Sequence, residues 1–133
     1  AADPNIVVDI KDGSASAGAN ARIFYANGTT AQKYAITSTG DGYYIIRNVK
    51  SGNVLDVAGA SAANGANVQQ YSYNGTLAQK WVVRNNGDGT YSFVNAGNGK
   101  CLDITSGRIV SGANIQQYTD NGSLAQKFRL KMK

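Results

Sequence analysis

The side chains that could carry chemistry in this chain of 133 residues are of few kinds. All eight acidic residues are Asp, histidine is absent, and Cys101 is the single cysteine. Without histidine, the Ser-His-Asp and Cys-His arrangements of nucleophilic catalysis are excluded. One thiol and no imidazole also exclude an ordinary zinc site and an internal disulfide. The Asp carboxylates remain as the candidate functional groups, and a carboxylate is a strong acceptor of hydrogen bonds from hydroxyl groups.

Three of the aspartates share one local context and follow one another at a step of 47 residues. Asp9, Asp56 and Asp103 each stand between two apolar residues. Residues 54–81 and 101–128 agree at 14 of 28 positions, so the chain is a repeat of three units. The same step separates the Asn-Gly pairs at Asn27, Asn74 and Asn121, and the aromatic residues that follow Ala-Gln-Lys at Tyr34, Trp81 and Phe128.

Each repeat is typical of short strands separated by turns. In the second repeat we expect strands at residues 43–49, 54–57, 68–71 and 80–84, where β-branched or aromatic residues lie between Gly, Asn and Asp. Three units are few for a stacked solenoid, whereas a closed threefold arrangement removes exposed edge strands. The sequence therefore predicts an all-β fold, a β-trefoil with a six-stranded barrel capped by three hairpins.

We expect one trefoil domain over residues 1–133, with repeats at 1–42, 43–89 and 90–133. The first strand of repeat 1 would fall before Ala1, because the matching strand of repeat 2 starts near Tyr43. The chain would then contain eleven strands, one fewer than the twelve of a full trefoil. We favour an upstream segment of a larger protein as the source of the twelfth strand. The alternative is a second copy of the chain, which would make a homodimer through the open barrel edge.

Three motifs are more specific than the repeat itself. They are Leu-Asp-Val at 55–57, Gly-Ala-Asn-Val-Gln-Gln-Tyr at 65–71 and Gln-Lys-Trp at 79–81, and they resemble the ricin B-type lectin family. That family includes bacterial carbohydrate-binding modules of the family 13 type, which carry a Gln-x-Trp repeat. The likeness extends over about residues 5–130, with the motifs in register three times. The resemblance implies a β-trefoil that binds sugars.

The resemblance also implies which residues contact the sugar. In each repeat the Asp would accept sugar hydroxyls, and an aromatic residue fifteen positions later would stack on the sugar ring. The Gln of Gln-x-Trp would mostly hold the hairpin together and support the Asp. The candidate sugar-binding residues are Asp9, Phe24, Asn27 and Gln32 in repeat 1, Asp56, Gln69, Tyr71, Asn74 and Gln79 in repeat 2, and Asp103, Gln116, Tyr118, Asn121 and Gln126 in repeat 3.

These candidates have alternatives and differ in rank. Many family members have a sugar-binding Asn where this chain has Ala31, Ala78 and Ala125. The Asn of each Asn-Gly pair would take over that contact. The alternative is that this Asn only forms a turn with the following Gly. The Asp residues would otherwise cap backbone amides in a tight turn. The first site ranks weakest, because Arg22 and Ile23 stand where the other repeats have two Gln.

The leading interpretation is a non-catalytic lectin module that binds galactose- or xylose-type sugars at up to three shallow sites. The alternative is a protein-interaction or inhibitor trefoil without sugar binding, because fold alone does not set function. A glycosidase with two catalytic aspartates is disfavoured, since the equivalent Asp residues would lie far apart around the barrel. A catalytic domain fused to this module, such as a glycoside hydrolase, is compatible with the interpretation.

Other partners are not expected. The net charge of +5 comes from scattered basic residues, which argues against a nucleic-acid interface. No apolar run approaches the ~18–20 residues of a membrane-spanning helix. We expect neither a metal ion nor a cofactor, and we expect a protein that is secreted or held at the cell surface.

Overall fold

The structure is a computed structural model, which describes residues 6–14, 16–105 and 112–129. Short strands and single turns of 3-10 helix make up the regular structure of this part of the chain. The strands are β1 (Ile6–Ile10), β2 (Ala21–Tyr25), β3 (Tyr34–Ser38), β4 (Tyr44–Asn48), β5 (Val54–Val57), β6 (Val68–Tyr71), β7 (Trp81–Asn85), β8 (Tyr91–Asn95), β9 (Cys101–Ile104) and β10 (Ile115–Tyr118). The 3-10 turns are η1 (Lys11–Gly13), η2 (Thr30–Gln32), η3 (Ala58–Ala60), η4 (Leu77–Gln79) and η6 (Leu124–Gln126).

One antiparallel hairpin recurs in each repeat. It pairs β1 with β2, β5 with β6, and β9 with β10. The register is the same in all three, because the aspartate lies opposite the residue thirteen positions later: Asp9 opposite Arg22, Asp56 opposite Gln69, and Asp103 opposite Gln116. The predicted strands at 54–57 and 68–71 are confirmed with these bounds, and the other two of repeat 2 lie at Tyr44–Asn48 and Trp81–Asn85.

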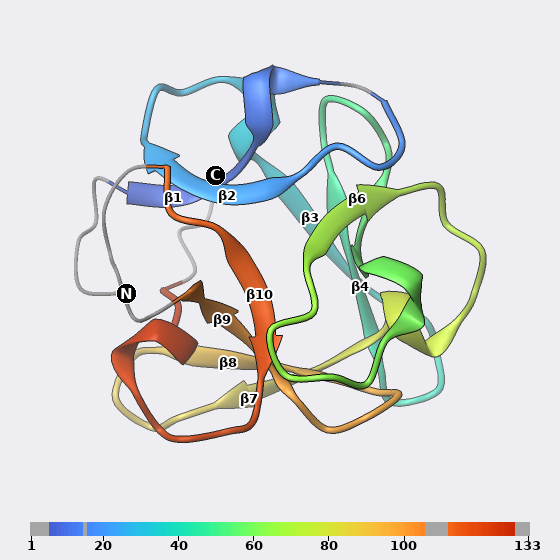
Figure 1. Ribbon diagram of the computed structural model, residues 1–133, viewed down its shortest axis with the longest axis vertical. Helices are drawn as coiled ribbons and strands as arrows, with labels where there is room; N and C mark the ends of the chain where they lie inside the picture. The colour runs from blue at the N-terminus through green and yellow to red at the C-terminus, as the bar shows by residue number, and fades with distance from the viewer. Residues whose placement is uncertain (1–5, 15, 106–111, 130–133) are drawn as a thin grey trace.

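The three hairpins meet around a central axis, where β2, β6 and β10 contact one another in pairs (Figure 1). Three asparagine amides form a closed ring there. Asn20 Nδ2 donates to Asn114 Oδ1 over 2.7 Å, Asn114 Nδ2 to Asn67 Oδ1 over 2.8 Å, and Asn67 Nδ2 to Asn20 Oδ1 over 2.7 Å. Each repeat contributes one donor and one acceptor, so the ring joins all three repeats. This closure is the β-trefoil that the repeat predicts.

The remaining strands form the wall of the barrel. β7 pairs with β8 along its length and with β4 at Tyr44–Trp81, and Tyr91 bridges to Phe128. Within the described residues β3 pairs with β4 alone, and four of its five residues are exposed. The expected open barrel edge stays a prediction, because the residues before Ile6 lie outside the described part.

The apolar core is shared by all three repeats. Trp81 is fully buried, and its indole Nε1 donates to the Leu55 carbonyl over 3.3 Å. The equivalent Phe128 is also buried and packs against Phe93, with ring centroids 5.9 Å apart. Cys101 is a free and buried thiol, as its lack of a partner cysteine predicts. The other large core residues are Ile10, Ile23, Ile46, Leu55, Leu102, Ile104 and Ile115.

Two buried glutamines fasten the loops to the hairpins. Gln70 Nε2 donates to the carbonyls of Ser14 and Ser16 over 3.0 and 2.8 Å. Gln117 does the same to Ser61 and Ala63 over 2.7 and 2.9 Å. Buried amides that satisfy loop carbonyls hold irregular backbone in one conformation. Among the described residues, no helix has the length and hydropathy that a membrane-spanning helix needs.

Replacing Trp81 tests how far the barrel depends on its single fully buried indole. Trp81→Ala should lower the free energy of unfolding by about 3–5 kcal/mol, because it leaves a large cavity in the core. Val82→Ala is the matched control, since Val82 is the next residue on the same strand and its side chain is exposed. It should cost less than about 1 kcal/mol. Urea unfolding followed by circular dichroism measures both, and equal losses would contradict the packing described here.

Candidate functional site

The hairpin of the second repeat brings a carboxylate and an aromatic ring to one face. Asp56 lies opposite Gln69, and Tyr71 follows Gln69 by two residues on the same strand. Alternate residues of a strand share a face, so the three side chains are neighbours. Asp56 is only 6% exposed, whereas Tyr71 is 43% exposed. A fixed acceptor therefore lies beside a ring that presents itself to solvent.

Gln79 holds this carboxylate in place from η4. Its Nε2 donates to Asp56 Oδ2 over 2.7 Å and to the Ser72 carbonyl over 2.8 Å. Its Oε1 accepts from the Asn74 backbone N–H over 2.8 Å. Gln79 is itself fully buried, so the amide cannot turn away without leaving these groups unpaired. The expected role of the Gln-x-Trp glutamine, to support the Asp and the hairpin, matches these contacts.

The third repeat reproduces the arrangement. Gln126 Nε2 donates to Asp103 Oδ2 over 2.8 Å, and Gln116 Nε2 donates to Asp103 Oδ1 over 3.3 Å. Gln126 also donates to the Thr119 carbonyl and accepts from the Asn121 backbone N–H, both over 2.9 Å. Tyr118 is 40% exposed at the position of Tyr71. The two sites thus share residue types, register and exposure.

Burial and hydrogen bonding act on Asp56 in opposite directions. Desolvation raises the pKa of Asp56, and hydrogen bonds from Gln79 and Gln69 partly offset that rise. A carboxylate offers about four lone-pair positions, so two amide donors leave acceptor capacity for a ligand. The arrangement can accept hydrogen bonds from two neighbouring hydroxyl groups.

The Asn-Gly pairs form turns next to these sites. Asn74 Oδ1 accepts from the Thr76 backbone N–H over 3.0 Å and from Thr76 Oγ1 over 2.8 Å. Gly75 has a φ of 77°, which glycine adopts without strain. Asn27 and Asn121 make the same Asn–Thr or Asn–Ser backbone contact, over 3.0 Å each. The side-chain oxygen of each Asn therefore takes part in a turn, and the contact of these Asn residues with a sugar stays a prediction.

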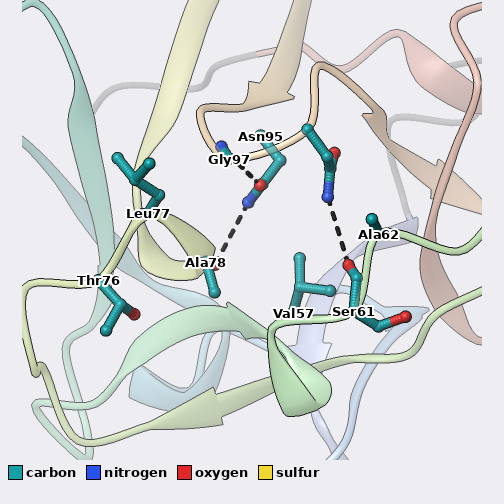
Figure 2. Close-up of a pocket in the computed structure, with 9 residues that line it drawn as sticks. Val57, Ser61, Ala62, Thr76, Leu77, Ala78, Asn95 and Gly97 are labelled. Carbon is teal, nitrogen blue, oxygen red and sulfur yellow. Dashed lines mark hydrogen bonds between the residues drawn. The ribbon is translucent and has the colours of Figure 1, made fainter.

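A hollow of about 270 Å³ lies next to the second site, and sequence reasoning missed it (Figure 2). The half-exposed side chain of Leu77 forms one wall. Asn95 Nδ2 donates to the Ala78 carbonyl over 3.3 Å and so ties the β8–β9 turn to η4. The exposure of Leu77 cannot be read from the sequence, so no sequence signal indicated this hollow. The lining residues are Val57, Ser61, Ala62, Thr76, Leu77, Ala78, Asn95, Gly97 and Asn98.

The first repeat departs from the other two. Asp9 accepts from Arg22 Nε over 2.9 Å, and the Arg22 guanidinium lies 4.2 Å from the centroid of the Phe24 ring. Gln32 donates to the Tyr25 carbonyl over 2.9 Å and accepts from the Asn27 backbone N–H over 2.8 Å. The site ranked weakest for a sugar has a hollow of about 670 Å³, which is larger than the hollow beside Leu77. It is lined by Asp9, Gly13, Arg22, Phe24, Asn27, Gly28, Thr29, Thr30, Ala31 and Lys50.

Other reactive groups give no second site in the described ranges. Within residues 6–14, 16–105 and 112–129, no three His, Cys, Asp or Glu side chains gather as metal ligands. Burial is the main cause that raises the pKa of the Cys101 thiol to about 11. A thiol of that pKa is protonated at neutral pH and is a poor nucleophile. Residues 106–111 lie outside the described part of the chain.

Solved structures with the same fold align with almost the whole chain. The designed threefold-symmetric protein ThreeFoil is 37% identical, with a TM-score of 0.90 over 93% of this chain and 94% of that chain. An exo-β-1,3-galactanase from Clostridium thermocellum is 32% identical, with a TM-score of 0.89 over 94% of this chain but 29% of that chain. The Rhizoctonia solani agglutinin is 21% identical, with a TM-score of 0.83 over 94% of this chain and 90% of that chain, which shows the fold alone.

Comparison with curated protein sequences gave no match. A family model described as the ricin-type β-trefoil lectin domain-like family matches residues 2–71 and 77–133. The match takes in the hairpins, the Asp residues and the Gln-x-aromatic motifs of all three repeats. This chain belongs to the ricin-type β-trefoil lectin domain-like family.

Proposed function

We propose that the protein is a non-catalytic carbohydrate-binding module that takes galactose- or xylose-type sugars at shallow surface sites. Membership of the lectin-like family supports carbohydrate binding in general. The second and third repeats supply the sites for these neutral sugars. Asp56 with Tyr71 forms one of them, and Asp103 with Tyr118 forms the other.

One observation carries this proposal. Twice in the molecule, a buried carboxylate fixed by a glutamine amide lies beside an exposed tyrosine on the same hairpin face. Sugar hydroxyls can donate to the carboxylate, and the apolar C–H face of a pyranose can cover the ring. A carboxylate with only a structural role would not need a half-exposed aromatic neighbour.

The class of sugar is supported from outside the site. The exo-β-1,3-galactanase that is 32% identical to this chain acts, as its name says, on a β-1,3-galactan, and this chain spans 29% of it. Galactose-type sugars are thus the first candidates. A single shallow site typically binds at about 1 mM, or about −4 kcal/mol. Two linked sites on one polysaccharide raise avidity without any new contact.

Removing the carboxylates tests the proposal directly. Asp56→Asn should remove one of the two neutral-sugar sites, and Asp56→Asn with Asp103→Asn should remove both, because the change replaces one acceptor oxygen by an NH2 donor and removes the negative charge. Calorimetry with galactose and xylose oligosaccharides measures stoichiometry and affinity. Asp88→Asn is the control, since Asp88 is exposed, pairs with Lys127 and is none of the residues assigned to a sugar site.

In that experiment circular dichroism must show that the variants remain folded. Undiminished binding of neutral sugars by the folded double variant would overturn the proposal. A double variant that is folded and inert, with Asp88→Asn unchanged, would support it.

Binding should also depend on pH. Because burial raises the pKa of Asp56 above its ordinary value of 3.8, this carboxyl gains its proton at a higher pH than an exposed aspartate. The protonated form loses acceptor capacity, so affinity should fall as the pH is lowered. The Asp103→Asn variant isolates the second site for this measurement. A midpoint above pH 3.8 is expected, and a midpoint at or below 3.8 would contradict the assigned role of Asp56.

A further inference from the structure

The first repeat has the same hairpin register as the others but a different charge. Arg22 lies opposite Asp9 where the other repeats place Gln69 and Gln116. Lys50 also lines the hollow, and its counterpart 47 residues later is Gly97. We infer that this hollow binds an anionic saccharide, one that carries a carboxylate or a sulfate group. The inference rests on the proposed function and assigns a second class of sugar to one of its sites.

Arg22 removes the features that would suit a neutral sugar. Its Nε donates to Asp9 Oδ2 over 2.9 Å, so the carboxylate is already neutralised by a cation. Its guanidinium lies 4.2 Å from the centroid of Phe24, the ring on which a pyranose would otherwise stack. A neutral sugar would have to displace an ion pair and a cation–π contact, and its hydroxyls would gain only one acceptor in return.

The same geometry suits an anion. A guanidinium has five N–H donors in a rigid fork, and only the Nε–H donor of Arg22 has a partner among the described residues. Asp9 and the Phe24 ring hold the Arg22 side chain, which is 17% exposed, so little entropy is lost when a ligand binds. The terminal nitrogens can therefore receive a carboxylate or a sulfate in a bidentate fashion.

Lys50 adds a second positive charge to the lining. Its Nζ donates to the carbonyl of Gly13, the last residue of η1, and both residues line the hollow. Among the described lining side chains, Arg22 and Lys50 are positive and Asp9 is negative, so the lining has a net charge of +1. The hollow beside the second site has no charged residue in its lining. A volume of about 670 Å³ lies within the ~300–1,000 Å³ of small-ligand pockets.

The test uses the full chain with the Asp56→Asn and Asp103→Asn changes, so that the first repeat is observed alone. Galacturonic acid, galactose 6-sulfate and galactose are titrated separately, and amide and Arg22 Nε–H resonances are followed by NMR. Binding of either anionic sugar with shifts at Arg22 and Phe24, weakened by added salt, is expected, and galactose should not bind. The two anionic sugars distinguish a carboxylate ligand from a sulfate ligand.

Two substitutions assign the charge. Arg22→Gln installs the residue of the other repeats and should weaken binding of the anionic sugar at least about tenfold. Lys50→Gly, which copies Gly97, should weaken it in the same direction and serves if Arg22→Gln does not fold. Arg84→Gln is the control for net charge, because Arg84 pairs with Asp120 outside the hollow, and it should leave binding unchanged.

The outcomes separate the two proposals. If the wild type binds galactose but the double variant binds neither anionic sugar, the first hollow is filled by a structural ion pair and this inference is overturned. If the wild type binds no neutral sugar at all, the proposed function of the second and third sites fails instead. Anionic binding that survives Arg22→Gln and Lys50→Gly undiminished would also overturn the inference.

Discussion

The three repeats bury their apolar side chains only by closing on one another around a common axis. No repeat has enough residues for a core of its own, and the core draws Ile10, Leu55 and Leu102 from three equivalent hairpins. The ring of Asn20, Asn67 and Asn114 satisfies three amides at the point where the hairpins meet. Half-buried amides that satisfy one another in this way favour a single arrangement, since any slip leaves donors and acceptors unpaired.

That closure explains why the sites are repeated and yet free to differ. The axis and the barrel fix the register of each hairpin, so the residue opposite each Asp is fixed in place whatever its identity. Gln69 and Gln116 complete two similar sites, whereas Arg22 at the same position forms an ion pair and covers an aromatic ring. One substitution thus changes the chemistry of a site without disturbing the frame that holds it.

Local and repeated signals are what the sequence could predict. Strands at 54–57 and 68–71 follow from short apolar runs between turn residues. The threefold repeat predicts the trefoil, because a closed arrangement of three units leaves no exposed edge strands. The direction of adjacent side chains could not be read in this way. Gln69 faces the site and Gln70 is buried against the Ser14 and Ser16 carbonyls, because tertiary contacts decide which of two neighbours turns inward.

The same limit applies to the first repeat and to the hollows. The sequence showed that Arg22 departs from the other repeats, but the pairing with Asp9 depends on the register and on the stacking against Phe24. The hollow beside Leu77 is formed by segments from two repeats, since Asn95 joins it from β8. Contacts between two repeats do not show in the residue pattern of either repeat alone.

The lone indole of the chain has a spectroscopic consequence. Trp81 is the single tryptophan, lies wholly inside the barrel and donates to a backbone carbonyl. Its emission maximum accordingly reports whether the barrel is intact and is insulated from solvent at the surface. Tyr71 and Tyr118 are exposed on the hairpin faces whereas Trp81 is buried, so a shift of the tryptophan emission maximum marks unfolding rather than contact of a ligand with these tyrosines.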